Sequence, residues 1–414
     1  MKFHFLTLFL ILGLISCQSG AQPLNTDTKT NHNTHKINKN ANTLEIQKVF
    51  SVTDLNKELG YQELKNGNIV FVFSPEIYGF SGNMKVFIEG SFNGWLKGID
   101  NKWMLTPNTD NTLQTLELPY DDVAAPGNCG FPEFKFYVIH EKTLKVEEPG
   151  ATTNLPGFKS GTNHVLLRAN DNPHEVVFAQ NSMAIKKPLS DFNIRNKKHT
   201  AILSNVRQVP ATEMLWRGYH PYKISRSDLD TERTRLELVK KLLKANKINS
   251  IICLSGNETP NKRENICEYQ QEIINAGNQL YINSSYNTVY YRSDSKDFQE
   301  QIAKIIHFIN KAPAPFYVHC RLGSDRTGVV SATLAALCGA DWKEIVTDYQ
   351  KTNEMGTGEY RSHRLLQYSF EKMLGKKIDK IENLQQEITE YFVNSGLLTK
   401  EDISNTVKKL TGKD

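Results

Sequence analysis

The chain has 414 residues, of which 39% are hydrophobic, and its formal net charge is +5 at pH 7. This length exceeds one ordinary core, which stops growing near about 250–300 residues, and it therefore predicts two domains. A charge this small excludes an extended nucleic-acid-binding surface, so we expect no nucleic-acid partner.

The N-terminal residues have the pattern of a processed signal. Lys2 precedes an apolar run at residues 5–14, which is shorter than the roughly 20 residues that span a bilayer. The sequence LISC at residues 14–17 resembles a bacterial lipobox, which implies a signal peptide over residues 1–16 and a lipid on Cys17. The alternative is an ordinary secretory signal.

A tether follows this signal. Residues 17–45 are rich in Asn, Thr and Lys and cannot bury enough apolar area to fold, so they predict a flexible link. We expect a protein anchored to the membrane through the lipid on Cys17. It would lie in the bacterial cell envelope, on the periplasmic or surface side and outside the cytoplasm.

The first folded segment is rich in short β runs. These runs are separated by turns without a helical stretch, which predicts an all-β sandwich over residues 46–180. The runs lie at residues 69–73, 84–88, 113–118, 134–139 and 165–167.

Three stretches of this segment resemble the glycogen-binding carbohydrate modules, namely VFIEGSFNGW at residues 86–95, EFKFYV at 133–138 and GTN at 161–163. In that family a sugar stacks on two tryptophans, because aromatic faces suit sugar rings. The resemblance implies that Trp95, Lys135 and Asn163 contact a glucan, although residues 141–143 (EKT) stand where the second tryptophan is expected. The alternative is an immunoglobulin-like spacer in which Trp95 fills a core position.

Helices and strands alternate in the second half of the chain. A helical pattern at residues 236–243, capped by Ser227 or Asp228, leads into a buried strand at residues 248–254. A further helix with Phe298 to Ile309 on one face precedes a strand at residues 316–318.

This alternation predicts an α/β domain over residues 200–375, with a mostly parallel central sheet flanked by helices. Ligands bind such sheets at the carboxyl ends of the strands. Residues 376–414 predict an amphipathic helical tail.

The sequence HCRLGSDRTG at residues 319–328 stands between the last strand and an apolar helix. Cys, five residues and Arg in this context resemble the signature of the protein tyrosine and dual-specificity phosphatase superfamily. A loop that enters a helix N-terminus presents backbone N–H groups and the positive end of the macrodipole to a phosphate, and it favours a thiolate. The residues expected to bind phosphate are Arg321, Leu322, Gly323, Ser324, Asp325 and Arg326.

Three side chains of this loop have expected catalytic roles. Cys320 is the nucleophile, and Arg326 offers a planar fork to two phosphate oxygens in the transition state. Thr327 donates a hydrogen bond to the sulfur when it leaves the phosphocysteine intermediate. This chemistry needs no metal and no other cofactor.

The leaving group needs a proton donor, normally an Asp on an upstream loop in this superfamily. Asp294 and Asp297 lie between strand-like residues 288–291 and the helix near Phe298, and Asp297 is expected to cap that helix. Asp325, directly before the signature Arg, resembles the loops of myotubularins and some bacterial secreted phosphatases, where this Asp shares the acid role. Asp325 and Asp294 both stay open as candidates.

These features predict an enzyme, a lipid-tethered phosphatase of the protein tyrosine or dual-specificity type. The first alternative is a glucan phosphatase, because those enzymes pair a carbohydrate module with such a domain. The second is a phosphatase of phosphoinositides or inositol phosphates, supported by Arg321 and Asp325. The third is a lipoprotein that binds phosphorylated ligands without turnover.

Five cysteines follow Cys17, and this odd number leaves at least one thiol free unless chains pair. A secreted location permits disulfides, and the pairing of Cys253 with Cys267 stays open.

Overall fold

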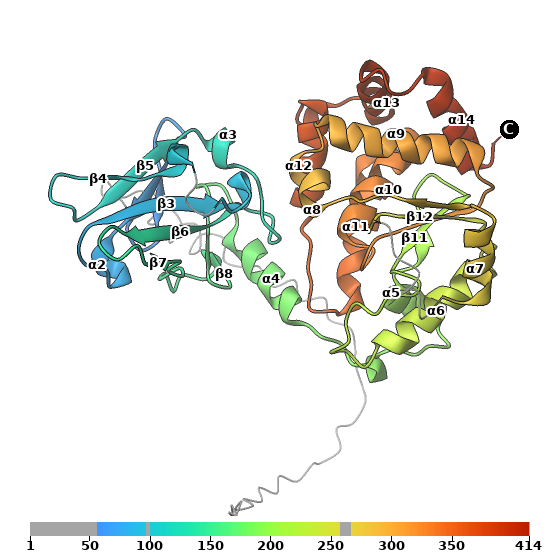
Figure 1. The fold of residues 1–414 in the computed structure, drawn as a ribbon, viewed down its shortest axis with the longest axis horizontal. Helices are drawn as coiled ribbons and strands as arrows, with labels where there is room; N and C mark the ends of the chain where they lie inside the picture. Colours follow the sequence, from blue (N-terminus) through green and yellow to red (C-terminus); the bar gives the residue numbers. More distant parts are fainter. Residues whose placement is uncertain (1–55, 97–99, 257–265, 414) are drawn as a thin grey trace, which may run out of the picture. The chain divides into compact units, whose positions relative to one another are not determined.

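The computed structural model describes residues 56–96, 100–256 and 266–413 (Figure 1). The lipobox, Cys17 and the expected tether lie outside the described residues. Within the described ranges, no helix is long and apolar enough to cross a membrane.

Two antiparallel sheets form the first domain. The sheets share one core, in which Phe71 of one sheet contacts Phe134 of the other with ring centroids 5.1 Å apart. The first sheet has the order β1 (Tyr61–Glu63), β2 (Ile69–Phe73), β5 (Gln114–Leu118), β4 (Thr106–Pro107). The second has the order β3 (Met84–Gly90), β6 (Glu133–His140), β9 (Asn163–Val165), β8 (Lys159–Ser160), with β7 (Val146–Glu147) paired to β6.

The burial pattern follows the period of two that strands impose. Phe134, Phe136 and Val138 of β6 are buried, whereas Lys135 and Tyr137 between them are only partly buried. The expected two-layer β-domain is thus present, while its assignment to an immunoglobulin-like topology stays a prediction.

Short helices interrupt these strands, so the expectation of an unbroken β pattern is wrong. Pro75 begins a four-residue helix after Ser74, as its fixed φ and missing N–H allow. These segments are α2 (Pro75–Tyr78), η1 (Ser91–Asn93), η2 (Asn101–Trp103) and α3 (Tyr120–Val123), and α4 (Pro173–Ala184) follows the last strand.

The buried tryptophan of this domain is Trp103, which is 7% exposed. Trp95 is only partly buried and has a positive φ of 59° after the turn at Gly94. The alternative in which Trp95 fills a core position is therefore wrong.

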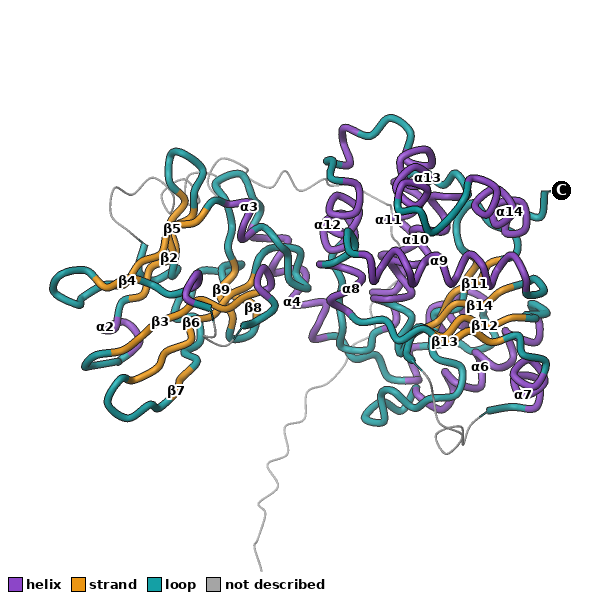
Figure 2. The backbone as a smooth tube through the Cα atoms, turned by 45° about the horizontal axis from the view of Figure 1, so that its top comes forward, coloured by secondary structure: helices purple, strands orange, loops and turns teal. Residues whose placement is uncertain are grey.

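The second domain is a five-stranded sheet with helices on both faces (Figure 2). All neighbouring strands are parallel except the β10–β11 pair, so the predicted mostly parallel sheet is confirmed. The strand order is β10 (Arg207–Gln208), β11 (Leu215–Gly218), β14 (Phe316–His319), β12 (Ser250–Cys253), β13 (Gln279–Tyr281).

Alternate residues of the central strands face two different cores. Ile252 and Val318 pack in the core with α9 and α10, while Ile251 and Tyr317 pack in the core with α6. The helices are α5 (Lys197–Ser204), α6 (Glu232–Ala245), α7 (Glu268–Asn275), α8 (Tyr286–Tyr291), α9 (Lys296–Lys311), α10 (Asp325–Leu337), α11 (Trp342–Lys351), α12 (His363–Leu374), α13 (Leu384–Asn394) and α14 (Lys400–Thr411). Short 3-10 turns are η3 (Leu189–Asp191), η5 (Thr352–Met355) and η6 (Ile378–Lys380).

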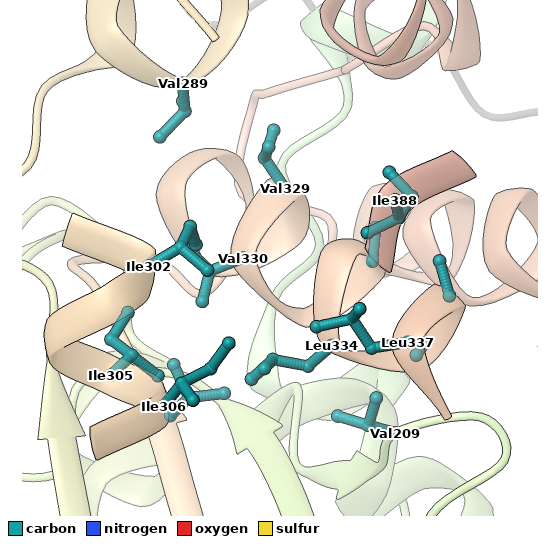
Figure 3. Packing of buried hydrophobic residues seen from close by; sticks show 14 of the residues in the cluster. Val209, Val289, Ile302, Ile305, Ile306, Val329, Val330, Leu334, Leu337 and Ile388 are labelled. Atoms are coloured by element: carbon teal, nitrogen blue, oxygen red, sulfur yellow. The ribbon is translucent and has the colours of Figure 1, made fainter. Parts of the chain in front are cut away.

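Helix α10 lies at the centre of the larger core. Every residue from Thr327 to Leu337 is buried, and Val330 and Leu334 face the isoleucines of α9 (Figure 3). Ile388 of α13 packs in the same core, so the expected tail forms part of this domain. A helix that is apolar all round is held on every side, which fixes the position of its N-terminus.

Three local expectations are wrong here. Helix α6 begins after Thr231 and not at Ser227 or Asp228, because Glu232 accepts from the Ser225 N–H and keeps the preceding segment in a loop. Residues 288–291 lie in the helix α8, whose N-cap Ser285 accepts from the Thr288 N–H.

The third concerns the cap of α9. That cap is Ser295, and Asp297 lies in the first turn of the helix instead. Among the described residues, Cys253 and Cys267 do not form a disulfide.

Candidate active site

The loop that follows β14 connects directly to the N-terminus of α10. Cys320 stands at its start, 2% exposed, and Arg326 lies in the first turn of the helix. Gly323 has a φ of +78°, and a Cβ there would lie 2.6 Å from the carbonyl carbon of Gly218. Only glycine permits this close approach between the loop and β11.

Three consecutive carbonyls of the loop are bonded to groups outside it. The Arg321 carbonyl accepts from the His220 N–H at 3.2 Å, and the Leu322 carbonyl accepts from Asn205 Nδ2 at 3.0 Å. The Gly323 carbonyl accepts from Arg217 Nη2 at 2.7 Å.

These bonds set the direction of the loop's N–H groups. In a trans peptide the N–H points opposite to the carbonyl of the preceding residue. The N–H groups of Leu322, Gly323 and Ser324 therefore point away from β11 and into the loop. Successive inward N–H groups before a helix N-terminus form a site for an anion such as phosphate.

A buried carboxylate holds the residues behind the loop. Asp348 Oδ2 lies 2.8 Å from Arg217 Nη1, and its Oδ1 lies 2.5 Å from Arg207 Nε. Burial alone would raise the pKa of Asp348, but Arg217 and Arg207 lower it below its ordinary value. Burial and Arg217 lower the pKa of Arg207 to about 10, partly offset by Asp348.

Arg326 is oriented by two carbonyls at the ends of neighbouring elements. Its Nη1 donates to the Leu254 carbonyl at 3.0 Å, just after β12, and to the Ser284 carbonyl at 3.2 Å, just before α8. No further hydrogen bond of Arg326 is found within the described ranges, which leaves its remaining N–H donors for a phosphate. Thr327 is fully buried, and its hydroxyl has no hydrogen-bond partner among the described residues.

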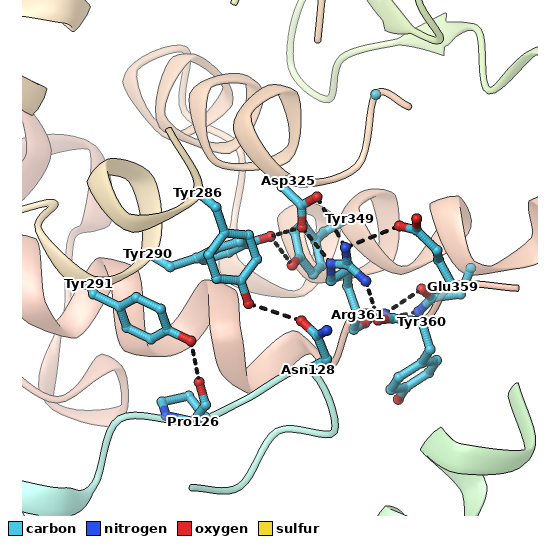
Figure 4. A network of polar contacts seen from close by, with 12 residues as sticks. Pro126, Asn128, Tyr286, Tyr290, Tyr291, Asp325, Tyr349, Glu359, Tyr360 and Arg361 are labelled. Carbon is cyan, nitrogen blue, oxygen red and sulfur yellow. Dashed lines mark hydrogen bonds and ion pairs between the residues drawn. The ribbon is translucent and has the colours of Figure 1, made fainter. Parts of the chain in front are cut away.

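The three candidate acids have different surroundings. Asp325 is the first residue of α10, where Oδ1 is 2.5 Å from Arg361 Nε and accepts from the Tyr290 hydroxyl at 3.2 Å (Figure 4). Asp294 is paired with Lys372 of α12 at 3.3 Å. Asp297 accepts from Thr288 and Gln301. Of the three, Asp325 is next to the signature Arg in the chain, and its carboxylate is bonded to Arg361 and Tyr290.

The ion pair with Asp325 also changes the pKa of Arg361. Burial alone would lower the pKa of Arg361, but Asp325 raises it above its ordinary value. Tyr290 is hydrogen-bonded to Tyr349 at 2.6 Å, and burial raises the pKa of both hydroxyls well above the usual range. The neighbouring hydroxyls of Tyr286 and Tyr291 donate to Asn128 and to the Pro126 carbonyl (Figure 4).

Two histidines and a cysteine lie behind the loop. Ligand atoms of His220, Cys253 and His319 lie within 4.8 Å of one another. His220 Nδ1 accepts from the N–H groups of Tyr222 and Lys223, so in the neutral ring Nε2 carries the proton and offers no lone pair to a metal. Burial lowers the pKa of His319 well below its usual value, and His220 adds to that effect. The cluster fits neutral core histidines better than a metal site.

The sequence alone does not indicate that several residues of this site have a role in it. No sequence motif assigns a role to Asn205, Arg217, Asp348 or Arg361. One signal was present: Arg217 interrupts an apolar strand, and a charged residue at such a position is normally paired.

Of the expected sugar-binding residues, Lys135 and Asn163 lie on the second sheet of the first domain, and Trp95 lies in a turn that follows it. Lys135 alternates with buried neighbours and thus faces away from the core, with its Nζ 3.9 Å from Glu148. Asn163 precedes the buried His164 and donates to Glu133 at 2.9 Å. Trp95 follows the end of β3 in the turn beyond Gly90.

Comparison with known proteins points to one class. Residues 219–410 match the model of the tyrosine phosphatase family. Among solved structures, the chain resembles the core catalytic domain of the PP-IP phosphatase SIW14 from S. cerevisiae in complex with citrate, at 17% identity and a TM-score of 0.27. That match covers 47% of this chain and 94% of the other. No curated protein matches the chain. The family match supports a cysteine-type phosphatase domain, and a TM-score this low indicates nothing about its substrate.

Proposed function

We propose that this chain hydrolyses phosphomonoesters through a phosphocysteine intermediate on Cys320. The proposal rests mainly on three consecutive carbonyls of the loop, which accept hydrogen bonds from groups outside it. The N–H groups of Leu322, Gly323 and Ser324 therefore point inward, beside Cys320 and Arg326. A buried thiol in an anion-binding loop is suited to attack a bound phosphate.

The reaction has two steps. The Cys320 thiolate attacks phosphorus, an S–P bond forms, and the P–O bond to the leaving group breaks while an acid supplies its proton. Water then attacks the phosphocysteine and gives a proton to the carboxylate left by the acid, while the S–P bond breaks with its electron pair on sulfur. The Thr327 hydroxyl, which is free of other bonds within the described ranges, donates to that departing sulfur.

We assign the acid role to Asp325. Asp325 directly precedes the signature Arg326 at the start of α10, and Arg361 holds its carboxylate there. Asp294 is instead paired with Lys372 of α12.

The test is hydrolysis of p-nitrophenyl phosphate by the full chain, compared with Cys320→Ser and Arg326→Lys. We expect Cys320→Ser to abolish turnover. We expect Arg326→Lys to lower kcat by at least about 100-fold, because a point charge cannot replace the planar fork. Equal rates for the parent and Cys320→Ser would rule the proposal out.

The proposed substrate type is a phosphoprotein, as in protein tyrosine and dual-specificity phosphatases. The lipobox-like LISC sequence supports a substrate in the cell envelope, where a lipid on Cys17 would hold the enzyme. Release of phosphate from a phosphotyrosine peptide, an inositol phosphate and phosphorylated glucan, measured side by side, separates the phosphoprotein, inositol phosphate and glucan alternatives. Binding of these compounds without turnover would instead indicate the lipoprotein that only holds phosphorylated ligands.

A second candidate function concerns the first domain. The partial exposure of Trp95 supports glucan binding over a core role, and Lys135 is likewise accessible on its sheet. Retention of the full chain on an amylopectin gel, with loss of retention in Trp95→Ala, tests this function. Migration unchanged by amylopectin would exclude it.

A further inference from the structure

Two arginines share one glutamate beside the phosphate loop, in an arrangement that phosphoryl transfer alone does not require. Glu359 pairs with Arg226 through Oε1 and with Arg361 through Oε2, the latter at 3.1 Å. The side chains of Arg226 and Glu359 are each 22% exposed and that of Arg361 is 13% exposed. One carboxylate thus lies between two guanidinium groups at a place that solvent reaches.

This cluster is attached to both ends of the loop. Arg361 holds Asp325, which directly precedes the signature Arg326 (Figure 4). At the other end, Arg321 Nη2 donates at 2.5 Å to the carbonyl of Ser225, the residue before Arg226. The two arginines are therefore held at the two edges of the phosphate-binding loop.

We propose that Arg226 and Arg361 form a second anion-binding site, which takes another phosphate of the substrate and which Glu359 occupies when substrate is absent. This inference rests on the proposed phosphatase activity and names its substrate class, compounds that carry two or more neighbouring phosphate groups. It makes Glu359 an internal competitor for the second phosphate.

Replacement of the Glu359 carboxylate by a substrate phosphate is electrostatically favourable. A guanidinium fork binds phosphate and carboxylate with similar geometry. A phosphate monoester carries about −1.5 to −2 charge at neutral pH, against −1 for the glutamate that it displaces. Because the substrate's first phosphate is already bound in the loop, its second one binds intramolecularly, at a high effective concentration.

The experiment measures two dissociation constants by isothermal titration calorimetry on the full chain carrying Cys320→Ser, which needs no turnover. The probes are orthophosphate, which fills the loop alone, and inositol hexakisphosphate, which presents phosphates at several spacings. We expect Glu359→Gln to strengthen binding of inositol hexakisphosphate relative to orthophosphate by about tenfold. We expect Arg226→Ala to weaken it by about tenfold on the same scale. Arg226 is chosen because Arg361 also holds Asp325.

The matched control is Glu300→Gln, which removes the same charge from an exposed pair with Lys296 on α9. It should leave the ratio of the two constants unchanged. The inference is overturned if Glu359→Gln and Glu300→Gln give the same ratio of the two dissociation constants. It is also overturned if Arg226→Ala leaves that ratio unchanged. In either case the cluster is a structural ion pair. Failure of the phosphatase proposal is read separately, from p-nitrophenyl phosphate hydrolysis by the parent chain.

The phosphates could belong to a soluble compound or to a lipid headgroup. Flotation of the same variants with phosphatidylcholine vesicles containing phosphatidylinositol bisphosphate distinguishes the two. Glu359-dependent binding to the free compound alone assigns a soluble substrate, and such binding to the vesicles as well assigns a headgroup. Absence of Glu359-dependent binding to both contradicts the inference.

Discussion

At the scale of single residues, the loop depends on where each polar group is directed. The side chains of Asn205 and Arg217 bond to the carbonyls of Leu322 and Gly323, and they thereby set the direction of the amides that we propose bind phosphate. Asp325 is directed by Arg361 in the same way. The loop groups that we propose to be catalytic are thus positioned by residues far away in the chain.

The acid role of Asp325 leads to a prediction about leaving groups. Asp325→Asn cannot donate the proton, so it should lower kcat on an alkyl phosphate by about 100-fold or more. Its effect on p-nitrophenyl phosphate should be much smaller, because p-nitrophenolate leaves without a proton. Steady-state kinetics on both substrates give the comparison.

Asp294→Asn is the matched control for that comparison. It removes the carboxylate that pairs with Lys372 and should leave both rates within about twofold. A leaving-group dependence that appears in Asp294→Asn and not in Asp325→Asn would move the acid role to Asp294.

At the scale of elements, Asp348 joins β10, β11 and α11 behind the loop. Arg217 is fully buried and the Arg207 side chain is only 14% exposed, so Asp348→Asn leaves both arginines without this counter-charge. We expect a loss of about 3–5 kcal/mol in the free energy of unfolding of the second domain, measured by urea denaturation. Glu300→Gln, which removes an exposed partner, should cost less than about 0.5 kcal/mol. Equal effects of the two would contradict a structural role for Asp348.

The pH dependence of this ion pair has a definite sign. The pKa of Asp348 is lower in the folded chain than its ordinary value of 3.8. The stabilisation is therefore complete above about pH 5 and is lost as the pH falls through the folded pKa, below 3.8. Asp348→Asn should lose this part of the acid sensitivity.

The burial of His164 in β9 predicts that the stability of the first domain also depends on pH. It is fully buried against Phe134, with ring centroids 4.8 Å apart, and burial lowers its pKa from 6.5 to about 4. The unfolded chain binds a proton near pH 6.5 and the folded domain does not. Stability should therefore fall by about 3 kcal/mol between pH 6.5 and pH 4.

Hydrogen exchange of peptides from β6 and β9, measured across this pH range, follows that loss. His164→Phe keeps an aromatic ring and removes the titration, so its protection should vary less with pH. His307→Phe, on an exposed part of α9, is the control and should behave like the parent. A parent domain whose protection is constant from pH 6.5 to pH 4 would contradict the role of His164.

At the scale of the whole molecule, the parts that follow local patterns could be predicted from the sequence. The strands at residues 69–73 and 316–318, the helix that carries Phe298 to Ile309 and the β-then-α/β order all follow from periodicity over short windows. The placement of Cys320 and Arg326 around a strand–loop–helix junction is equally local.

Features that depend on distant contacts could not be predicted. Residues 288–291 have the composition of a strand but form a helix, because Ser285 caps it and its tyrosines bond to other elements. The pairing of Asp325 with Arg361 joins residues that no motif connects. The bonds from Asn205 and Arg217 to the loop likewise span more than one hundred residues.

We propose that Cys320 carries the phosphoryl group during turnover. The most direct measurement is peptide mass spectrometry of the full chain after acid quench during hydrolysis of p-nitrophenyl phosphate. We predict a mass increase of one phosphoryl group on the peptide that contains Cys320, absent in Cys320→Ser. Turnover with no such adduct, or with the adduct on another residue, would contradict the account.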